Sequence, residues 1–257
     1  MGAKGDGVVE NAMTVRRVAS TAALVCSACI VMIGMVRAEP RAVIELFTSQ
    51  GCSSCPAADK ILGQLGADPS IVAMSLPVDY WDYLGWKDTL ALPGHSKRQR
   101  AYARSRGDRE VYTPQVVVNG TKHVLGNDRN AIERAIALSR GGATALPVTV
   151  TISSDKLTVT VPAAKDERGS GEVWLCTVSK EVPVEIARGE NRGRTVTYHN
   201  VARRWIKLGD WKGSAQTFTV PITDLKGEHV DALAVLLQSG SSDNPGPVLG
   251  AALAGLH

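Results

Sequence analysis

The chain has 257 residues, of which 44% are hydrophobic, 21% charged and 5% aromatic. This composition is typical of globular proteins and excludes wholesale disorder, a collagen helix and a coiled coil. The formal net charge of +4 is too small to indicate nucleic-acid binding, and five cysteines in a chain of this length do not make a disulfide scaffold.

The first 38 residues are predicted to be an export signal. Arg16 and Arg17 precede an uncharged run over 18–36, and Val36-Arg37-Ala38 has small residues at the two positions of an A-x-A-like cleavage site. Cleavage after Ala38 predicts a periplasmic or secreted protein. The chain stays at a membrane only if the run is retained as an anchor.

Residues 39–142 are predicted to form an α/β domain. The apolar run 42–47 predicts a buried strand, apolar residues at helical spacing over 58–65 predict a helix that ends at Gly66, and 71–78 predicts a second strand. A strand, a helix and a strand in succession predict a right-handed parallel unit. The other predicted elements are a basic helix over 96–106, a strand over 115–118 that turns at Asn119-Gly120, and a closing helix around 132–136.

The pattern changes after the double glycine at 141–142. Short strand-like segments alternate with turn residues, and no convincing helix follows. This pattern predicts a separate, mostly β, sandwich-like domain over residues 143–257. Its predicted strands are 146–152, 157–161, 172–178, 195–199, 205–208, 216–220 and 232–237.

A Cys-x-x-Cys motif is the main chemical signal. Cys52 and Cys55 lie at the start of the first predicted helix, whose N-terminus stabilises a thiolate, while the second cysteine lies one turn away and can close a disulfide. We therefore expect Cys52 to be an exposed nucleophile and Cys55 a shielded resolving thiol. The motif is also half of a zinc site, but no second ligand pair follows, so no metal is predicted. A cysteine pair is its own redox group and needs no dissociable cofactor.

The order of elements resembles the thioredoxin fold: strand, Cys-x-x-Cys, helix, strand, a Thr113-Pro114 step into a hairpin, and a closing helix. Three runs, ELFTSQGCSSCP over 45–56, VDYWDYLGWKD over 78–88 and GENRGR over 189–194, are similar to a family of secreted bacterial thioredoxin-like proteins of unknown function, DUF1223. The resemblance implies a cis proline at Pro114 that faces the cysteines. It implies no particular reaction, and Ser53-Ser54 between the cysteines departs from thioredoxin, so no reduction potential carries over.

Further candidates flank the cysteines. Glu45 is a carboxylate in an otherwise apolar strand, and we expect it to serve Cys55 as a base; the alternative is an ion pair with a basic side chain. Trp81 and Tyr83, with Thr113, predict one wall of a substrate-binding groove beside the cysteines. The alternative for the aromatic stretch is that it packs a long connection onto the core.

Other polar and cysteine residues have simpler interpretations. Cys176 is predicted to be a small buried residue in a strand. Arg192, Arg194 and His199 are candidates for a family-specific surface. A basic segment is expected to be a solvated helix face, with anionic lipid or an acidic partner as the alternative; it contains Lys97, Arg98, Arg100, Arg104, Arg106 and Arg109.

Together these features favour an exported thiol–disulfide oxidoreductase that acts on protein thiols or disulfides and exchanges electrons with a redox partner protein. The second hypothesis is a binding protein in which the cysteine pair is a structural disulfide. The third is a periplasmic copper protein that uses both cysteines and a histidine such as His95 or His123. Copper ranks last because spacing selects no ligand histidine.

Overall fold

The structure is a computed structural model that describes residues 40–139, 146–164 and 169–256. The predicted export signal lies outside the described residues. In the described ranges, no helix has the length and apolar character needed to cross a membrane. The helices are α1 (Cys55–Gly66), α2 (Pro93–Arg106) and α3 (Arg129–Leu138), with 3-10 turns η1 (Asp82–Leu84) and η2 (Ile222–Asp224).

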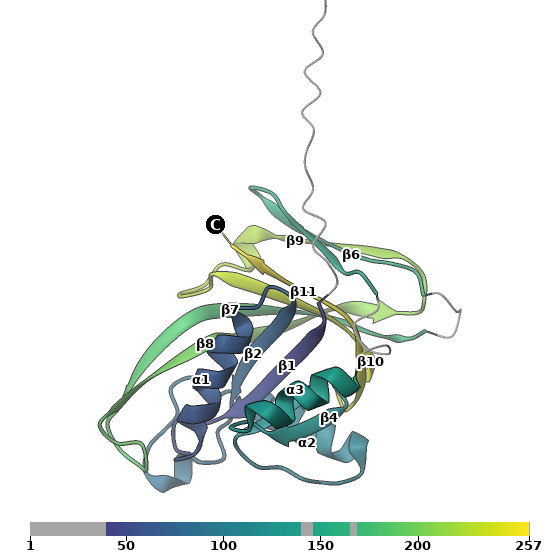
Figure 1. The fold of residues 1–257 in the computed structure, drawn as a ribbon. Helices are drawn as coiled ribbons and strands as arrows, with labels where there is room; N and C mark the ends of the chain where they lie inside the picture. Colours follow the sequence, from purple (N-terminus) through teal and green to yellow (C-terminus); the bar gives the residue numbers. More distant parts are fainter. Residues whose placement is uncertain (1–39, 140–145, 165–168, 257) are drawn as a thin grey trace, which may run out of the picture. The chain divides into compact units, whose positions relative to one another are not determined.

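The strands form two sheets (Figure 1). The larger has eight strands in the order β11-β10-β7-β8-β2-β1-β3-β4, and the smaller has three in the order β5-β6-β9. Their bounds are β1 (Ala42–Thr48), β2 (Ile71–Pro77), β3 (Gln115–Val118), β4 (Lys122–Leu125), β5 (Thr149–Ile152), β6 (Lys156–Val161), β7 (Gly171–Ile186), β8 (Arg194–Trp211), β9 (Gln216–Pro221), β10 (Ala232–Ser241) and β11 (Asn244–Gly255).

Many local predictions for the first half are confirmed. β1 and β2 pair in parallel around α1, which ends at Gly66. β3 and β4 form an antiparallel hairpin at Asn119-Gly120, and both turn residues have positive φ, at 50° and 74°. This is the backbone conformation for which an Asn-Gly pair is favoured. The side chain of Asp128 caps α3 by accepting a hydrogen bond from the Ala131 N–H at 2.9 Å.

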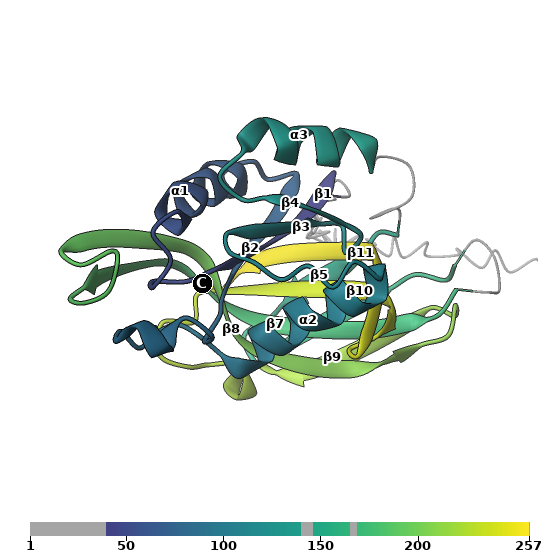
Figure 2. The ribbon, with the colours of Figure 1, turned by 90° about the horizontal axis from the view of Figure 1, so that it is seen from below.

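The helices cover both faces of β1 and its neighbours. Figure 2 shows α1 and α3 on one side of the strands and α2 on the other. Alternate residues of β1 divide between these faces: Ile44 and Leu46 pack with Leu62 of α1 and Ile132 of α3, whereas Phe47 packs on the side of α2. Every residue of β1 is therefore buried, as expected for a strand covered on both faces.

The predicted fold class, a thioredoxin-like α/β domain over 39–142 followed by a separate sandwich-like β domain over 143–257, is wrong. One eight-stranded sheet contains strands from both ranges, and β2 meets β8 at the Ser75–Val201 pair. The reason is visible in β10, whose two faces are both apolar. Leu233 and Val235 face the three-stranded sheet, whereas Ala234 and Leu236 share a core with β1, β2 and α2. A separate β domain would leave that second face in water.

Two strands in the second half also differ from prediction. β8 is continuous where two short strands were predicted, because the left-handed Asn200 and a bulge near Val178 interrupt the alternation of apolar and polar residues. β11 was missed altogether. Its sequence, NPGPVLGAALAG, is rich in Gly, Ala and Pro, which have low strand propensity, and it lies at the edge of the sheet, where Pro is tolerated.

Candidate functional site

The two cysteines of the motif lie where β1 leads into α1. β1 ends at Thr48, the chain turns through 49–54, and α1 begins at Cys55. Cys52 and Cys55 form a disulfide. Cys55 is fully buried and Cys52 is 3% exposed, so Cys52 is not the exposed residue that we expected. The exposed part of the motif is the pair between them, Ser53 and Ser54.

One wall of the site comes from the predicted aromatic stretch and the proline step. Trp81 packs against Gly51, where an added Cβ would lie 3.1 Å from the Trp81 Cβ. The Trp81 indole N–H donates to the Thr113 hydroxyl at 2.8 Å, and the Thr113–Pro114 peptide bond is cis. Tyr83 stacks on Trp81 and is 78% exposed. Trp81 therefore contacts the cysteine turn, and Tyr83 and Thr113 contact Trp81. Their role as a substrate-binding wall stays a prediction.

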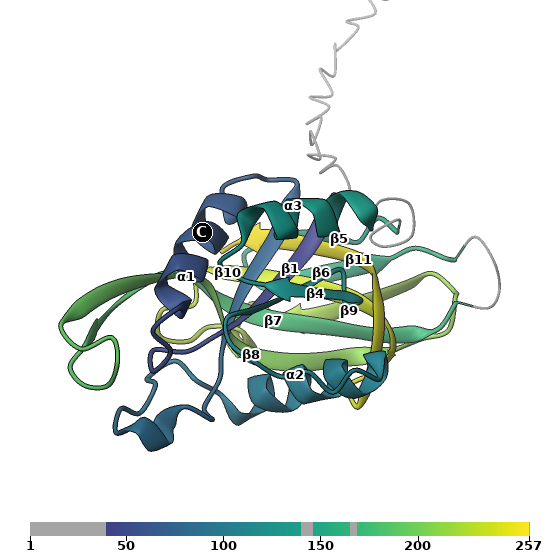
Figure 3. The same ribbon diagram turned by 60° about the horizontal axis from the view of Figure 1, so that its bottom comes forward.

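The opposite wall is the tip of the long β7–β8 hairpin, which extends past α1 (Figures 1 and 3). Asn191 is fully buried, and its side-chain amide donates to the carbonyl oxygens of Gln50 at 2.9 Å and Cys52 at 2.8 Å. The Ser53 N–H donates to the Glu190 carboxylate at 3.1 Å. Sequence reasoning assigned these two residues no role, although both belong to the run over 189–194. The hairpin tip and Trp81 therefore both contact the turn that holds the buried Cys52.

We expect Asn191→Ala to loosen the cysteine turn. The variant loses two buried hydrogen bonds and leaves two carbonyl oxygens without that donor, which costs about 1–3 kcal/mol. Urea unfolding should show this loss, and the disulfide should be reduced faster by a small thiol. Asn127→Ala, at an exposed position, is the matched control. Unchanged reduction kinetics in Asn191→Ala would show that the hairpin does not limit access to Cys52.

A buried carboxyl lies one turn beyond Cys55 on the same face of α1. Asp59 is 1% exposed; Cβ atoms four residues apart in a helix are about 6 Å apart. The Thr48 hydroxyl donates to its Oδ2 at 3.1 Å, and its Oδ1 has no partner in the described structure. Burial raises the pKa of Asp59 well above its usual value, although the Thr48 hydrogen bond opposes that rise.

A second buried acid lies near Asp59. Burial raises the pKa of Asp88 to about 6, although the backbone N–H groups of Gln50 and Leu90 donate to its carboxylate at 2.8 and 2.9 Å. Asp88 also contributes to the raised pKa of Asp59, after burial. Burial raises the pKa of the buried Tyr198 phenol of β8, and both carboxylates raise it further. Asp59 and Asp88 are thus two buried acids beside the cysteine turn.

Glu45 takes the alternative role, that of a partner in an ion pair. Its carboxylate accepts from Arg98 Nε at 2.6 Å and Nη2 at 3.1 Å, and the Tyr102 hydroxyl also donates to it. Along β1, Glu45 shares a face with Phe47, on the side of α2, whereas Leu46 faces α1. Glu45 therefore lies on the opposite side of β1 from the helix that carries Cys55.

We expect Glu45→Gln to reduce stability without changing the pH dependence of disulfide exchange. The substitution leaves the 13%-exposed Arg98 guanidinium without its counter-ion, and breaking a buried pair costs about 3 kcal/mol or more. Asp243→Asn breaks the exposed pair with Lys97 and should cost less than about 1 kcal/mol. Denaturation measures both losses. An altered pH profile in Glu45→Gln would restore its proposed role as a base.

The model of the family described as "Protein of unknown function (DUF1223)" matches residues 43–238 of the chain. The chain belongs to this family. A protein from Agrobacterium tumefaciens whose crystal structure is known has a sequence 32% identical to this chain. The two structures superpose with a TM-score of 0.75, and the match covers 84% of this chain and 95% of that one. HBP35 of Porphyromonas gingivalis is 14% identical, with a TM-score of 0.58 and coverage of 85% and 76%, which shows a likeness of fold alone. Among curated proteins, none matches.

Of the remaining candidates of this DUF1223 protein, Arg194 lies beside the cysteine turn, because its guanidinium donates to the Asn191 amide oxygen at 3.2 Å. The candidate cysteine and histidines contact other parts of the fold. Cys176 is free and fully buried in the core, as predicted, and burial raises the pKa of its thiol to about 12. His95 is buried with Nδ1 2.9 Å from the Pro77 carbonyl oxygen, and burial lowers the pKa of its ring to about 4. His123 contacts Tyr112 and Asp108. In the part of the chain that the structure describes, no three metal-ligating side chains gather.

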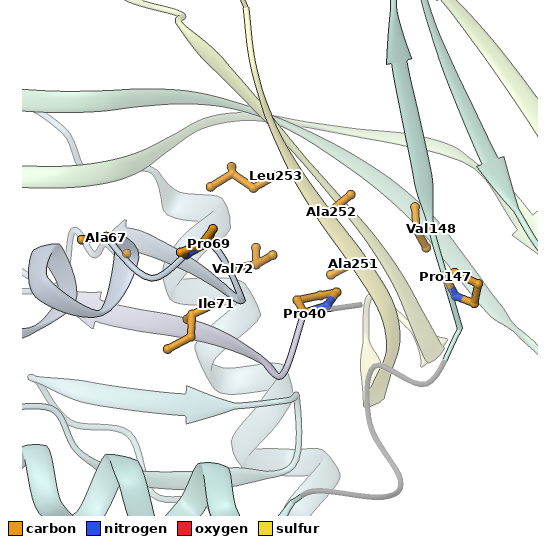
Figure 4. A pocket seen from close by; sticks show the side chains of 11 residues that line it. Pro40, Ala67, Pro69, Ile71, Val72, Pro147, Val148, Ala251, Ala252 and Leu253 are labelled. Atoms are coloured by element: carbon orange, nitrogen blue, oxygen red, sulfur yellow. The ribbon is translucent and has the colours of Figure 1, made fainter. Parts of the chain in front are cut away.

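An apolar hollow of about 200 Å³ lies at the other end of the parallel strands. In Figure 4, Pro40, Ile71 and Val72 line it together with Ala251 and Leu253 of β11. Pro40 and Ile71 lie at the starts of β1 and β2, whereas the cysteine turn follows the end of β1. The hollow is therefore separate from the disulfide site.

Proposed function

We propose that this DUF1223 protein exchanges thiols and disulfides through Cys52 and Cys55. The observation that carries the proposal is a disulfide closed at the N-terminus of α1 with the buried Asp59 carboxyl one turn further along the same face. The first feature provides a redox pair next to a helix dipole that favours a thiolate. The second provides a group that can hold a proton near the more deeply buried sulfur.

Reduction of the pair proceeds in two balanced steps. A partner thiolate attacks Cys52 Sγ; the new S–S bond forms as the Cys52–Cys55 bond breaks, and the Cys55 sulfur leaves with the electron pair and takes the proton of Asp59. A second partner thiolate then attacks the partner's sulfur in the mixed disulfide, and Cys52 leaves as a thiolate. The partner ends as a disulfide, and the protein ends with a Cys52 thiolate and a Cys55 thiol. The reverse sequence reduces a partner disulfide.

The hairpin tip influences the same chemistry. The Glu190 carboxylate accepts a hydrogen bond from the Ser53 N–H in the turn before α1. A Cys52 thiolate in this turn would be stabilised by the positive end of the helix dipole. A nearby negative charge disfavours that thiolate and therefore the reduced state. Asn191 must also release the Cys52 carbonyl, or the tip must shift, before a large partner reaches the sulfur.

A second candidate function is a binding protein with a structural disulfide. It is favoured by the 3% exposure of Cys52 and by the hydrogen bonds that hold the turn closed. A titration of the full chain in glutathione buffers, read by alkylation and intact mass, separates the two. A potential of roughly −120 to −270 mV supports exchange, whereas one below about −300 mV supports a structural disulfide.

We further propose that the protein is exported and that its signal is cleaved after Ala38. This follows from the arginines at 16 and 17 and the uncharged run after them, and an oxidising compartment suits a protein that carries a disulfide. Intact mass of the protein recovered from the periplasm tests both points. A chain that begins at residue 39 supports cleavage, and recovery only from the cytoplasm contradicts export.

A further inference from the structure

The six basic residues over 97–109 fall into two groups in the structure. Three of them pair with carboxylates: Lys97 with Asp243 at 3.1 Å, Arg98 with Glu45 at 2.6 Å and Arg106 with Asp108 at 2.7 Å. The other three, Arg100, Arg104 and Arg109, lie within salt-bridge distance of no carboxylate in the described ranges. A solvated helix face therefore describes only part of the segment.

The three unpaired arginines line one surface hollow of about 640 Å³. Arg100 and Arg104 are one turn apart on α2 and so lie on one face. Arg109 returns to that face because the chain reverses after Gly107, and its own φ is +57°, a conformation that costs a side-chain-bearing residue energy. The N–H groups of Gly107 and Arg109 both donate to the Ala103 carbonyl oxygen, which holds the reversal in place.

Three positive charges around one hollow repel one another and attract an anion with several charges. All three arginines are exposed, and one exposed ion pair contributes only about 0–1 kcal/mol. A single small anion would gain little at this surface, whereas several carboxylates on one polypeptide can each pair with a guanidinium fork. The apolar side chains of Ala103 and Val111 in the same hollow also suit a polypeptide.

Two connections place the hollow close to the disulfide site: a short stretch of chain and a set of side-chain contacts. Val111 is two residues before Thr113, a span of at most about 7 Å, and Thr113 accepts the indole hydrogen bond of Trp81. On the other side, the Tyr80 hydroxyl donates to Gln99, the neighbour of Arg100 in α2, at 3.1 Å, so this part of α2 lies beside the residue before Trp81. A polypeptide at Cys52 can therefore extend across Trp81 into the hollow.

We propose that Arg100, Arg104 and Arg109 bind an acidic segment of the polypeptide whose disulfide or thiols react with the Cys52–Cys55 pair. This inference rests on the proposed exchange function and adds the substrate class: proteins with several Asp or Glu residues close to the reacting cysteine. The attraction is electrostatic and exposed to solvent, so it weakens as salt screens it.

The test compares two disulfide-linked peptides of identical core, one flanked by three Glu residues and the other by three Gln residues, with the neutral hydroxyethyl disulfide as a small substrate. Reduced full-chain protein reacts with each at low and high salt.

In R100Q/R104Q/R109Q, the second-order rate constant for the Glu peptide at low salt should fall about 10-fold or more, and the rate constants for the other two substrates should stay the same. K156Q/K212Q/K226Q, which removes the same charge from exposed positions elsewhere, should keep all three rates. Equal rates for the Glu and Gln peptides in the unmodified protein would overturn the proposal.

A binding measurement separates this proposal from the exchange function. A cysteine-free, fluorescently labelled Glu peptide should bind the unmodified protein and the lysine control, but not the arginine variant. If this pattern holds while no disulfide reacts, the exchange function fails and the acidic-segment surface remains. If phosphatidylglycerol vesicles, rather than the Glu peptide, bind in an arginine-dependent way, the hollow is a membrane surface and the proposal is overturned.

Discussion

Cys52→Ser is expected to reduce disulfide exchange on the order of 1,000-fold or more, because serine provides no sulfur for a mixed disulfide. The fold should survive the change. The disulfide closes a loop of only a few residues. For such a short loop, the loss of chain entropy in the unfolded state predicts that the disulfide stabilises the fold by about 2 kcal/mol. The measurement is the rate of reduction of a peptide disulfide by the reduced protein, with near-native circular dichroism as a check on folding.

Two other variants make this result specific. Cys55→Ser keeps Cys52 but removes the resolving thiol, so a mixed disulfide with the partner should accumulate and appear on a non-reducing gel. Cys176→Ala removes the buried free thiol and should leave exchange unchanged. If Cys52→Ser retains exchange, the cysteine motif is not the redox group, and the proposed function is wrong.

Asp59→Asn is expected to make the protein more stable at neutral pH and slower in exchange. Burial raises the pKa of Asp59 in the folded chain above its unfolded value, so the folded state holds the proton more tightly. This contribution to stability is fully present below the unfolded pKa and is lost as the pH rises through the folded pKa. Each unit of the difference corresponds to about 1.4 kcal/mol. Asparagine keeps the shape without the charge, so the stability advantage of the variant should grow with pH.

Thermal melts from pH 4 to 8 measure this advantage. Asp88, with a pKa of about 6, adds a similar pH dependence between about pH 4 and 6 to both proteins, and that part should remain in the variant. Asp243→Asn, at an exposed position, is the control. Exchange by Asp59→Asn should fall on the order of 100-fold and lose one titration from its pH profile, because the Cys55 sulfur loses its proton carrier. Unchanged exchange with raised stability would mean that Asp59 is only a buried acid.

Glu45 and Asp59 show how far sequence reasoning extends. Glu45 is conspicuous in the sequence because its neighbours in the strand are all apolar, and its burial was correctly inferred. Its partner was not, because Arg98 is 53 residues away and reaches it from α2. Asp59 looks like a solvent-facing residue of an amphipathic helix. It is buried because β8 packs against α1 so closely that an added Cβ at Gly63 would lie 2.4 Å from the His199 ring.

Sequence patterns were enough to predict the local elements of the first half, the Cys-x-x-Cys pair at a helix start and the family to which the chain belongs. These follow from periodicity, turn residues and short motifs, which act over a few neighbouring residues. Three features arise from long-range contacts: the two halves share one sheet, a hairpin tip with Glu190 and Asn191 contacts the cysteine turn, and Asp59 rather than Glu45 lies on the side of Cys55. Such contacts join residues up to 141 positions apart. They depend on which apolar faces find each other, and no local pattern records that choice.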